Sequence, residues 1–431
     1  DVMKLNKIAA VIALGALSVP AMATNGYFSH GYGMKAKGMA GVGIALPQDG
    51  LAAATNPAGI TEVGDRLDLG VDYFMPRRSA EITGNTFGAG AFNGSWSGDG
   101  QKNFLVPELG YNKKLGWDMA VGVAVYGNGG MNTHYDSNPF AAGGLGTALG
   151  GQNPGGVNLE QLFVAPTFAM KVNKDHSLGV SVIYAYQRFG ATGLQAFAAA
   201  GASSDANSLT NNGYAHSHGW GLRLGWNGKV SDNVTLGATY ASKTKMSKFG
   251  QYKGLFAEQG GFDIPENYGV GIAVKATPKL TVAADVQQIN YGKVKSIANK
   301  VNFACLGATC FLGNDNGPGF GWRDMTVFKL GLSYEYSKDL TLRAGVSTNR
   351  QPIPSSETFF NILAPGVIEN HLTLGGTWTL ANRNELTFSY MHGFSKSVNG
   401  SGSIGAGFGG GEANIKMHQD SLGVAYGIKF D

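Results

Sequence analysis

Apolar residues alternate with small or polar ones along most of the chain. In one such stretch, Trp220, Leu222 and Leu224 share one face of an extended chain, while Gly221 and Arg223 fall on the other. A period of two is that of a β-strand with one apolar face. The pattern predicts fourteen strands, at residues 66–82, 101–114, 117–127, 159–172, 176–189, 215–228, 233–248, 263–276, 279–294, 323–336, 339–351, 368–380, 384–397 and 417–430.

The predicted strands are long, and their connections alternate between short and long. Many strands run to about a dozen residues, whereas strands usually have about five or six. Gly, Ser, Thr and scattered charges occupy the faces opposite the apolar ones, as in a polar lumen. Tight turns alternating with long outer loops are typical of bacterial outer-membrane proteins. The sequence therefore predicts an all-β fold, a 14-stranded antiparallel transmembrane β-barrel over residues 63–431 with long extracellular loops, integral to the outer membrane.

Composition agrees with a membrane barrel. Glycine accounts for 67 of 431 residues, about twice its usual share, and charged residues for only 14%, well below the usual ~25%. No run of 18 apolar residues follows the start of the chain, so we expect no membrane-spanning helix. The net charge of +4 is small and gives no reason to expect a nucleic-acid partner.

The first 23 residues have the order of a secretory signal peptide. A basic start and a short apolar run are followed by Ala21-Met22-Ala23, with small residues at the first and third places. We expect a signal peptide over residues 1–23, running from Met3 behind a two-residue stub, with cleavage after Ala23.

Residues 24–62 lack the alternation of the strands. They include "ALPQDGLAAATNPAGI" at positions 45–60, which is apolar and rich in small residues. A barrel of fourteen strands is wider than its own side chains can fill, and an open lumen would leak solutes. We therefore expect this segment to form a hatch domain that plugs the lumen. The alternative is a disordered periplasmic tail, although such a tail is usually more polar.

Two stretches resemble a known family. "GYGMKAKGMAGVGIALPQDGLAAATNPAG" resembles the N-terminal hatch of the FadL family, outer-membrane transporters for long-chain fatty acids and other hydrophobic compounds, and its Asn56-Pro57-Ala58 triplet looks like the hatch signature. "GWRDMTVFKLGLSYEYSKDLTLRAGVSTNRQPIP" is similar to the family far downstream. The resemblance covers essentially the whole mature chain. The early glycine-rich stretch is also similar to the branch associated with aromatic hydrocarbons, and the motifs do not separate the branches.

The resemblance implies a mechanism of passive transport. Family members capture an apolar ligand in a groove of outer loops, pass it to a lumen pocket, and release it through a side opening when the hatch moves. A kink in the third strand makes that opening. Here the third predicted strand runs into Gly127, Gly129 and Gly130, and glycine in a strand often marks a bulge. The same glycines are compatible with the plain start of an outer loop.

Two predicted outer loops, 128–158 and 190–214, contain unusually apolar runs. Exposed apolar patches usually mark binding sites. The alternative is that these side chains pack on one another as a lid. The residues expected to form the entry groove are Phe140, Leu145, Leu149, Leu194, Phe197 and Leu209.

Several charged residues alternate with lipid-facing ones and should point into the lumen. The cations could meet a ligand carboxylate, or they could join an ion-pair network that holds hatch to wall. Arg343 lies in the family-like "LTLRAG" and is the first choice for a ligand contact or a hatch anchor. The expected lumen and hatch residues are Asn56, Pro57, Ala58, Arg223, Lys329 and Arg343, with the carboxylates Glu108, Asp285 and Glu335.

The sequence contains little that points to catalysis. Cys305 and Cys310, a close pair in an exported protein, predict one disulfide in a loop. His216 and His218 share a strand face, but two histidines without a third ligand make a weak metal site. No hydrolase, metalloprotease or nucleotide-binding motif occurs. We therefore expect no enzymatic activity, no cofactor and no metal.

Two other functions fit a barrel of this kind. A general diffusion porin for hydrophilic solutes would have an open, conducting lumen, and a surface receptor or adhesin would act through its loops alone. For a transporter, the expected partners are a hydrophobic small molecule, a fatty acid or a hydrocarbon, together with outer-membrane lipid and lipopolysaccharide. The resemblance suggests a monomer.

Overall fold

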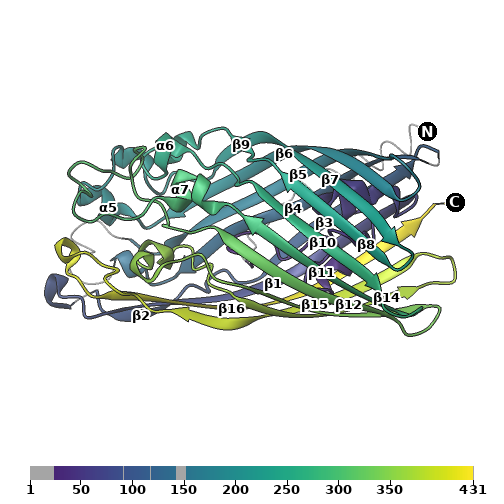
Figure 1. Ribbon diagram of the computed structural model, residues 1–431. Helices are drawn as coiled ribbons and strands as arrows, with labels where there is room; N and C mark the ends of the chain where they lie inside the picture. The colour runs from purple at the N-terminus through teal and green to yellow at the C-terminus, as the bar shows by residue number, and fades with distance from the viewer. Residues whose placement is uncertain (1–23, 91, 117, 142–151, 431) are drawn as a thin grey trace.

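The computed structural model describes residues 24–90, 92–116, 118–141 and 152–430. Within them, fourteen long strands pair antiparallel in chain order, and the last pairs with the first, so that the sheet closes into a barrel (Figure 1). The predicted fold class is therefore confirmed. The strands are β1 (Arg66–Thr83), β3 (Phe104–Lys114), β4 (Met119–Tyr135), β5 (Gly155–Lys171), β6 (His176–Thr192), β7 (Ala215–Ser231), β8 (Val234–Ala241), β10 (Asn267–Lys275), β11 (Leu280–Ile289), β12 (Met325–Glu335), β13 (Leu340–Asn349), β14 (Asn370–Thr379), β15 (Glu385–Val398) and β16 (Glu412–Lys429).

The two ends of the barrel differ. Long connections with short helices gather at one end, called here the loop end, and tight turns gather at the other, the turn end (Figure 1). No described helix has both the length and the apolar character needed to cross a bilayer. The loop-end elements are η2 (Phe87–Gly90), β2 (Gly94–Ser97), η3 (Pro139–Ala141), α5 (Gln195–Ala199), η4 (Ala206–Ser208), β9 (Lys245–Met246), η5 (Gly250–Tyr252), α6 (Ala257–Gly260), η6 (Tyr291–Lys293), α7 (Lys295–Ala298), η7 (Ser355–Glu357), η8 (Phe360–Ile362) and η9 (Ala406–Phe408).

Each of the fourteen predicted positions holds a strand, but some boundaries were wrong. The prediction ended the third strand at residue 127, whereas β4 continues to Tyr135. Residues 126–133 of β4 are buried on both faces, so the alternation that marks strands elsewhere is absent there. The strand predicted at 279–294 ends at Ile289, because η6 and α7 follow it.

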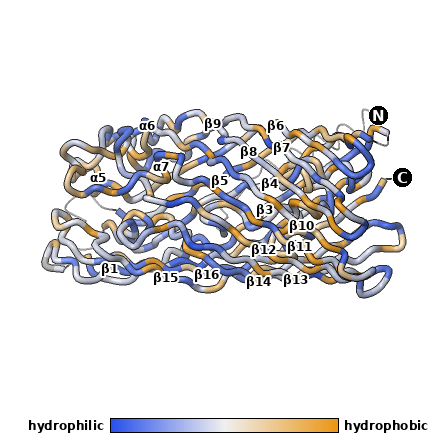
Figure 2. The backbone as a smooth tube through the Cα atoms, in the orientation of Figure 1, coloured by the Kyte–Doolittle hydropathy of each residue, from blue (hydrophilic) through white to orange (hydrophobic). Residues whose placement is uncertain are grey.

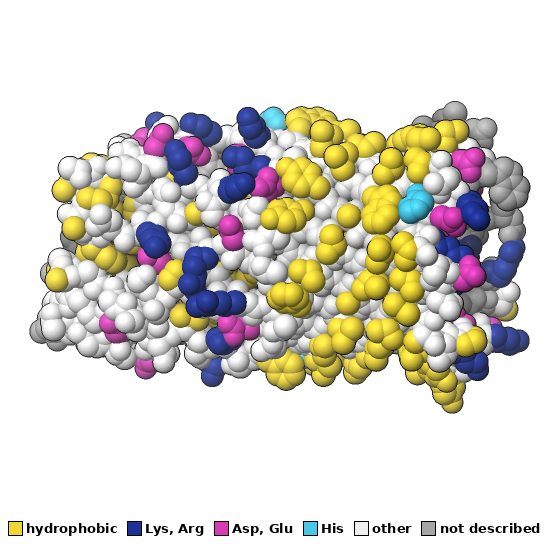
Figure 3. Space-filling view, viewed as in Figure 1, with side chains coloured by type: hydrophobic (Ala, Val, Ile, Leu, Met, Phe, Trp, Pro, Cys, Tyr) yellow, Lys and Arg dark blue, Asp and Glu magenta, His cyan; other side chains and the backbone are white. Residues whose placement is uncertain are grey.

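The outer surface of the barrel is an apolar belt. Alternate side chains face outward and are largely exposed, for example Trp220 (61%), Val270 (59%) and Leu374 (51%). Figure 2 shows the resulting alternation of hydrophobic and hydrophilic residues along the strands, and Figure 3 shows the hydrophobic side chains gathered between two more polar ends. Such a belt matches the hydrocarbon layer of an outer membrane.

The lumen is filled by the N-terminal segment, residues 24–62. It lies inside the barrel towards the turn end (Figure 1), and nearly all of its side chains are buried. Its helical turns are α2 (Met34–Lys37), α3 (Ala52–Thr55) and η1 (Pro57–Thr61). These short turns pack on the inner wall, which positions the site described next.

Candidate functional site

Glycines of the inner wall let the N-terminal segment approach closely. A Cβ atom at Gly225 of β7 would lie 1.9 Å from Asn56 Oδ1, and one at Gly179 of β6 would lie 2.4 Å from the backbone N of Ala58. Any larger side chain at these positions would displace the segment. Close backbone contact thus accounts for part of the high glycine content noted in the sequence.

Asn56 fixes the turn that precedes Pro57 and Ala58. Its Nδ2 donates to the backbone oxygens of Ile44 (2.7 Å) and Trp226 (2.9 Å), and its Oδ1 accepts from the backbone N of Ala58 (3.1 Å). Asn56 therefore caps η1 and ties it to β7. The triplet 56–58 is fully buried between segment and wall.

The three predicted lumen cations all contact the N-terminal segment. Lys329 Nζ donates to the backbone oxygen of His30 (2.9 Å), and Arg223 donates to that of Thr55 (3.2 Å). Arg343 Nε donates to Gln48 Oε1 (2.9 Å). In this structure, therefore, these cations hold the segment.

Wall carboxylates also bind the segment. Asp285 Oδ2 accepts from the backbone N of Gly43 (2.8 Å) and of Ile44 (3.1 Å), and Glu108 Oε2 accepts from the backbone N of Gly33 (3.2 Å). Glu335 continues the alternation that turns Lys329 inward, but, unlike Lys329, it is exposed at the turn end of β12. The reason is its place at the end of the strand, where the lumen opens to solvent.

Two lysines of α2 make buried ion pairs with the wall. Lys37 Nζ lies 2.9 Å from Asp72 Oδ2, and both side chains are almost fully buried. Lys35 Nζ lies 2.6 Å from Glu385 Oε2, which also accepts from Arg66 (2.7 Å). Such pairs are strongly destabilising when only one partner is removed, because a buried charge is left uncompensated.

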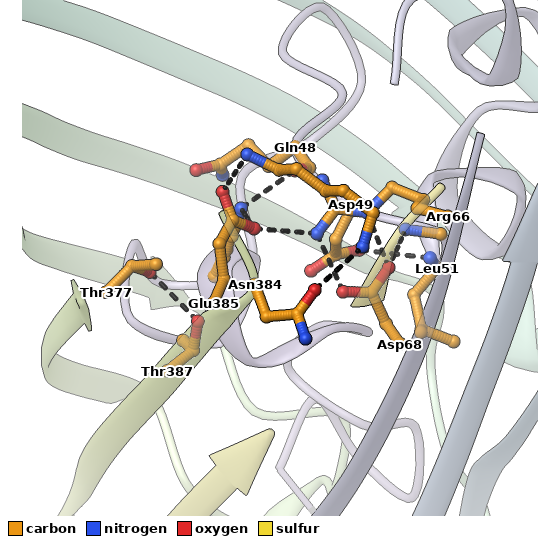
Figure 4. Close-up of polar contacts among 12 residues, drawn as sticks. Gln48, Asp49, Leu51, Arg66, Asp68, Thr377, Asn384, Glu385 and Thr387 are labelled. Atoms are coloured by element: carbon orange, nitrogen blue, oxygen red, sulfur yellow. Dashed lines mark hydrogen bonds and ion pairs between the residues drawn. The ribbon is translucent and has the colours of Figure 1, made fainter. Parts of the chain in front are cut away.

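Figure 4 shows the polar network around Glu385 and Arg66. Arg66 binds Asp68 through Nε (2.7 Å), and Asp68 also accepts from the backbone N of Gly50 (2.7 Å). Asp49, in the segment, lies beside this network (Figure 4); it is buried, and its Oδ1 accepts from the backbone N of Leu51 (3.0 Å). Burial, and then the negative charge of Asp68, raise the pKa of Asp49 to about 7.

β4 carries an irregularity at the predicted glycines. Its pairing with β5 shifts register between Gly127 and Gly129, so one residue, Asn128, is extra. The N-terminal segment pairs with β4 at this point: the backbone N of Gly130 donates to Tyr27 O (2.9 Å), and that of Ser29 donates to Asn128 O (2.9 Å). The glycines therefore lie within a strand and do not begin the loop.

The same part of β4 separates from β3. The pairing of β3 with β4 ends at Leu109 and Val125. Further towards the loop end, β4 contacts the chain that precedes β3, where the backbone N of Gly100 donates to His134 O (3.0 Å). The stretch of wall between these two points, bordered by residues 104–108 and 126–133, is called here the wall window. The N-terminal segment covers it from inside, at residues 27–29.

A large apolar cavity lies among the outer loops. It has a volume of about 330 Å³, and aromatic rings contact one another around it, as between Phe140 and Phe197 (5.2 Å between centroids) and between Phe303 and Phe408 (5.5 Å). None of the described residues that line it is charged. The cavity, called here the outer chamber, is lined by Ile82, Asn85, Phe87, Phe92, Phe140, Ala196, Phe197, Ala200, Phe303, Leu306, Phe359, Ile404, Gly407 and Phe408.

The predicted groove residues fall in different places. Phe140 and Phe197 line the outer chamber, and Phe197 and Leu194 line a smaller apolar cavity of about 40 Å³. Leu209 is fully buried and lines neither cavity. Leu145 and Leu149 lie outside the described residues.

Most of the chamber's phenylalanines were not singled out from the sequence. Phe303, Phe359 and Phe408 come from three further loops, and each stands in an otherwise mixed sequence. The pair "FF" at 359–360 was the one available signal, since two adjacent aromatics are unusual in an exposed loop. The predicted disulfide between Cys305 and Cys310 is present, and it closes the short loop that carries Leu306 of the chamber.

A small inner cavity lies beside the wall window. Tyr27, Phe74, Met131 and Trp322 contribute to its mainly apolar lining, together with Arg78. Arg78 is 2% exposed, and its guanidinium donates to Gly98 O (2.7 Å) and Asn132 Oδ1 (3.0 Å), among other acceptors. Its Nε has no hydrogen-bond partner among the described residues. Arg78 is the one cation among the described residues that line the inner cavity, and it was missed from the sequence.

A further cavity of about 400 Å³ opens at the turn end. The N-terminal segment contributes Ala45, Leu46 and Pro47 to it, and the surrounding turns contribute charged side chains such as Lys171 and Asp232. The lining is more polar than that of the outer chamber. Among the described residues, no cluster of three or more His, Cys, Asp or Glu side chains could hold a metal ion.

A known family matches nearly the whole chain. The family described as outer membrane protein transport protein (OMPP1/FadL/TodX) matches residues 16–431. A long-chain fatty acid transport protein of Escherichia coli is 25% identical over 446 residues, which covers 90% of this chain and 91% of that protein. A protein of the same name from Salmonella typhi is 24% identical over 334 residues, covering 69% and 70%.

Solved structures share the fold. A FadL homologue of Pseudomonas aeruginosa superposes with a TM-score of 0.70 at 18% identity, covering 94% of this chain and 100% of that one. The toluene transporter TodX of Pseudomonas putida superposes with a TM-score of 0.66 at 19% identity, covering 93% and 99%. At these identities, the likeness establishes the fold alone.

Proposed function

Because the chain belongs to the FadL/TodX family of outer-membrane transport proteins, we propose that it moves hydrophobic compounds, fatty acids or hydrocarbons, from the outer chamber through the lumen to the wall window. The protein is an outer-membrane transporter and not an enzyme. The proposal concerns how the cargo is captured, where it passes and how it leaves.

The observation that carries the proposal is the lining of the outer chamber. Seven phenylalanines and no charged side chain face a cavity of about 330 Å³ at the loop end. An apolar molecule gains about 0.8 kcal/mol for each CH₂ that it buries. A hydrophilic solute gains nothing there and loses its hydration. The chamber therefore selects oily molecules at the entrance.

A second cavity at the loop end, and then the inner cavity, continue the apolar lining. Phe197 lines both the outer chamber and the second cavity, which also includes Leu363 and Phe360. Leu363 lines the second cavity, and the next residue, Ala364, lines the inner cavity. Met131, at the edge of the wall window, also lines the inner cavity. We infer that a molecule passes along this series when side chains between the cavities move.

The N-terminal segment acts as the hatch in this proposal. It blocks the axial route, and it pairs with β4 where the wall window begins. Movement of residues 27–29 away from Gly129 would uncover the window from inside. The cargo would then leave sideways into the bilayer, where it is soluble, rather than into water.

An uptake assay tests the function. Gram-negative cells that lack their own transporter would express this chain and receive a labelled fatty acid or labelled toluene. Phe140→Gln should slow uptake of whichever compound is carried, whereas Phe140→Leu, which keeps an apolar side chain, should change it little. Equal uptake by cells with and without the protein, for both compounds, would reject the proposal.

The porin alternative makes a different prediction. A general porin would conduct ions steadily in planar bilayers, whereas a barrel plugged by residues 24–62 should show little conductance. A large steady conductance of the intact protein would favour the porin. A receptor or adhesin that acts through its loops alone would be indifferent to changes in the N-terminal segment.

A further inference from the structure

On the face drawn in Figure 3, charged side chains form a band between the apolar belt and the outer loops. In Figure 3, Lys and Arg side chains gather on the loop-end side of the hydrophobic belt. Several of these cations have an acidic partner close by. The pairs in the band include Lys243–Asp263 (3.4 Å), Lys293–Glu266 (2.8 Å) and Lys396–Glu369 (2.5 Å).

Two arginines are among the exposed loop-end cations that form no ion pair with a described residue, as are Lys245 and Lys248. Arg323 precedes β12 and Arg350 follows β13, and the strands pair up to Val327 and Asn349 at this end. The backbone N of Arg323 donates to Pro352 O (2.9 Å), so the two arginines lie on adjacent chains of the same ladder. Both are exposed, and neither guanidinium has an ion-pair or hydrogen-bond partner anywhere in residues 24–90, 92–116, 118–141 or 152–430.

The neighbouring carboxylate does not neutralise them. Asp324 lies between Arg323 and β12, but its Oδ1 accepts from the backbone N of Gly292 (2.7 Å), and it forms no ion pair with either arginine. The wall immediately below is apolar and exposed, with Phe328 (52%) and Val346 (48%) at the first positions below the polar rim. Arg350 continues the outward alternation of Val346 and Thr348. The exposed Arg323 lies on the neighbouring chain, beyond the loop end of the same lipid-facing surface.

We propose that Arg323 and Arg350 bind a phosphate group of lipopolysaccharide in the outer leaflet, with the acyl chains of the same molecule against Phe328, Leu330 and Val346. The loop end of an outer-membrane barrel faces outward, so this band lies at headgroup level. Guanidinium groups are weakly hydrated and match phosphate oxygens with two parallel donors. Clustered basic side chains at the membrane interface recognise anionic lipid headgroups in the same way.

The combination favours a lipid over other anionic partners. An acidic protein would be attracted by the charges but would gain nothing from Phe328 and Val346, which face acyl chains. Free phosphate would be held by the arginines alone. A phosphorylated glycolipid satisfies both parts of the surface. The inference depends only on the outer-membrane location and not on the transport proposal.

The test is titration of the delipidated protein in detergent, followed by native mass spectrometry. Three probes are used: lipopolysaccharide, the same lipopolysaccharide with its phosphates removed, and inorganic phosphate. The double variant Arg323→Glu/Arg350→Glu is compared with Lys275→Glu/Lys279→Glu, which reverses two exposed charges at the turn end. Gel mobility before and after heating verifies that each variant forms the barrel.

We expect the arginine double variant to bind lipopolysaccharide at least about thirtyfold more weakly, since each of the two basic residues contributes about 1 kcal/mol near an anionic surface and about 1.4 kcal/mol corresponds to a factor of ten. The lysine control should bind as the wild type does, and wild-type protein should bind the dephosphorylated lipid about as weakly as the arginine variant binds the intact lipid. Equal weakening in both variants, or no difference between the two lipids, would overturn the proposal. Binding of inorganic phosphate as tight as that of the lipid would overturn its lipid part. Should the arginine variant fail to fold, the comparison of the two lipids on the wild type decides.

Discussion

Gly225 of β7 and Asn56 of the N-terminal segment are in contact that leaves no space for a side chain: a Cβ at position 225 would lie 1.9 Å from Asn56 Oδ1. Gly225→Val should therefore displace the segment, at a cost of about 1–3 kcal/mol for overpacking. Displacement of the segment opens the lumen, so the variant should conduct ions in planar bilayers, whereas the wild type should not. Gly376→Ala on β14 is the control, because its nearest neighbour would be 3.8 Å away. Unchanged conductance in Gly225→Val would show that this contact does not hold the plug.

The ion pair between Lys37 and Asp72 gives a second test of how the segment is held. Either Lys37→Met or Asp72→Asn alone should loosen the segment strongly, because breaking a buried pair costs about 3–5 kcal/mol. The double variant should recover only part of the loss, because Asp72 no longer leaves a lone charge but Glu108, whose Oε2 lies 3.6 Å from Lys37 Nζ, loses its partner. Protease cleavage within residues 24–62 of the folded barrel measures the loosening. Additive effects of the two changes would argue against coupling between these side chains.

Asp49 and His30 respond to pH in opposite directions when the segment leaves the wall. Burial and Asp68 raise the pKa of Asp49 from 3.8 to about 7, so release of the segment frees a proton and docking weakens as the pH rises from about 4 to 7. Burial, then Lys37 and Lys329, lower the pKa of His30 from 6.5 to about 3, so release takes up a proton and docking weakens as the pH falls from about 6.5 to 3. The two effects nearly cancel between pH 4 and 6.5.

Replacing either Asp49 or His30 should reveal the pH dependence of docking that the remaining group causes. In Asp49→Asn, conductance should appear on acidification from pH 6.5 to 4.5, with the docking equilibrium changing by up to tenfold for each pH unit. In His30→Gln, docking should instead weaken towards pH 7. The wild type should change little over this range. A flat profile in both variants would mean that neither group changes its protonation when the segment moves.

A substitution of Arg78 tests whether the cargo has a carboxylate group. Arg78 Nε lies 4.0 Å from Asp99 Oδ1 but has no hydrogen-bond partner among the described residues. We expect it to donate to a cargo carboxylate in the inner cavity, where a hydrogen bond to a charged group contributes about 1.5–3 kcal/mol. Arg78→Met should thus weaken binding of a fatty acid by about ten- to a hundredfold, and binding of the alcohol of equal chain length much less. The ratio of the two affinities within each variant removes general effects on folding. An unchanged ratio would indicate that Arg78 stabilises the barrel wall and does not contact the cargo.

The sequence predicted the strands well because most of them separate two different environments. Trp220 and Leu222 face lipid while Arg223 faces the lumen, so periodicity alone assigns their faces. The outer half of β4 was not predicted, because it is buried on both sides and carries no alternation. Inward direction of Arg223, Lys329 and Arg343 followed from the same periodicity.

The contacts of these residues could not be predicted in the same way. Lys329 binds the backbone oxygen of His30, nearly 300 positions away, and a backbone acceptor leaves no mark in the sequence. The outer chamber gathers Phe87, Phe303 and Phe408 from three separate loops, and their meeting depends on how the loops fold over one another. Only Phe140 and Phe197 lay in runs apolar enough to attract notice.

The most direct test of the account is to find where a bound cargo molecule lies along the barrel. A photoactivatable fatty-acid analogue would be bound to the purified protein and irradiated, and the labelled peptides identified by mass spectrometry. The account predicts adducts in the outer chamber and at the wall window, on residues 104–108 and Met131, with the window adducts lost when Asn128 is deleted to restore the regular pairing of β4. Adducts at the turn-end cavity, on Ala45, Leu46 or Pro47, with none at the window, would contradict the proposed sideways exit.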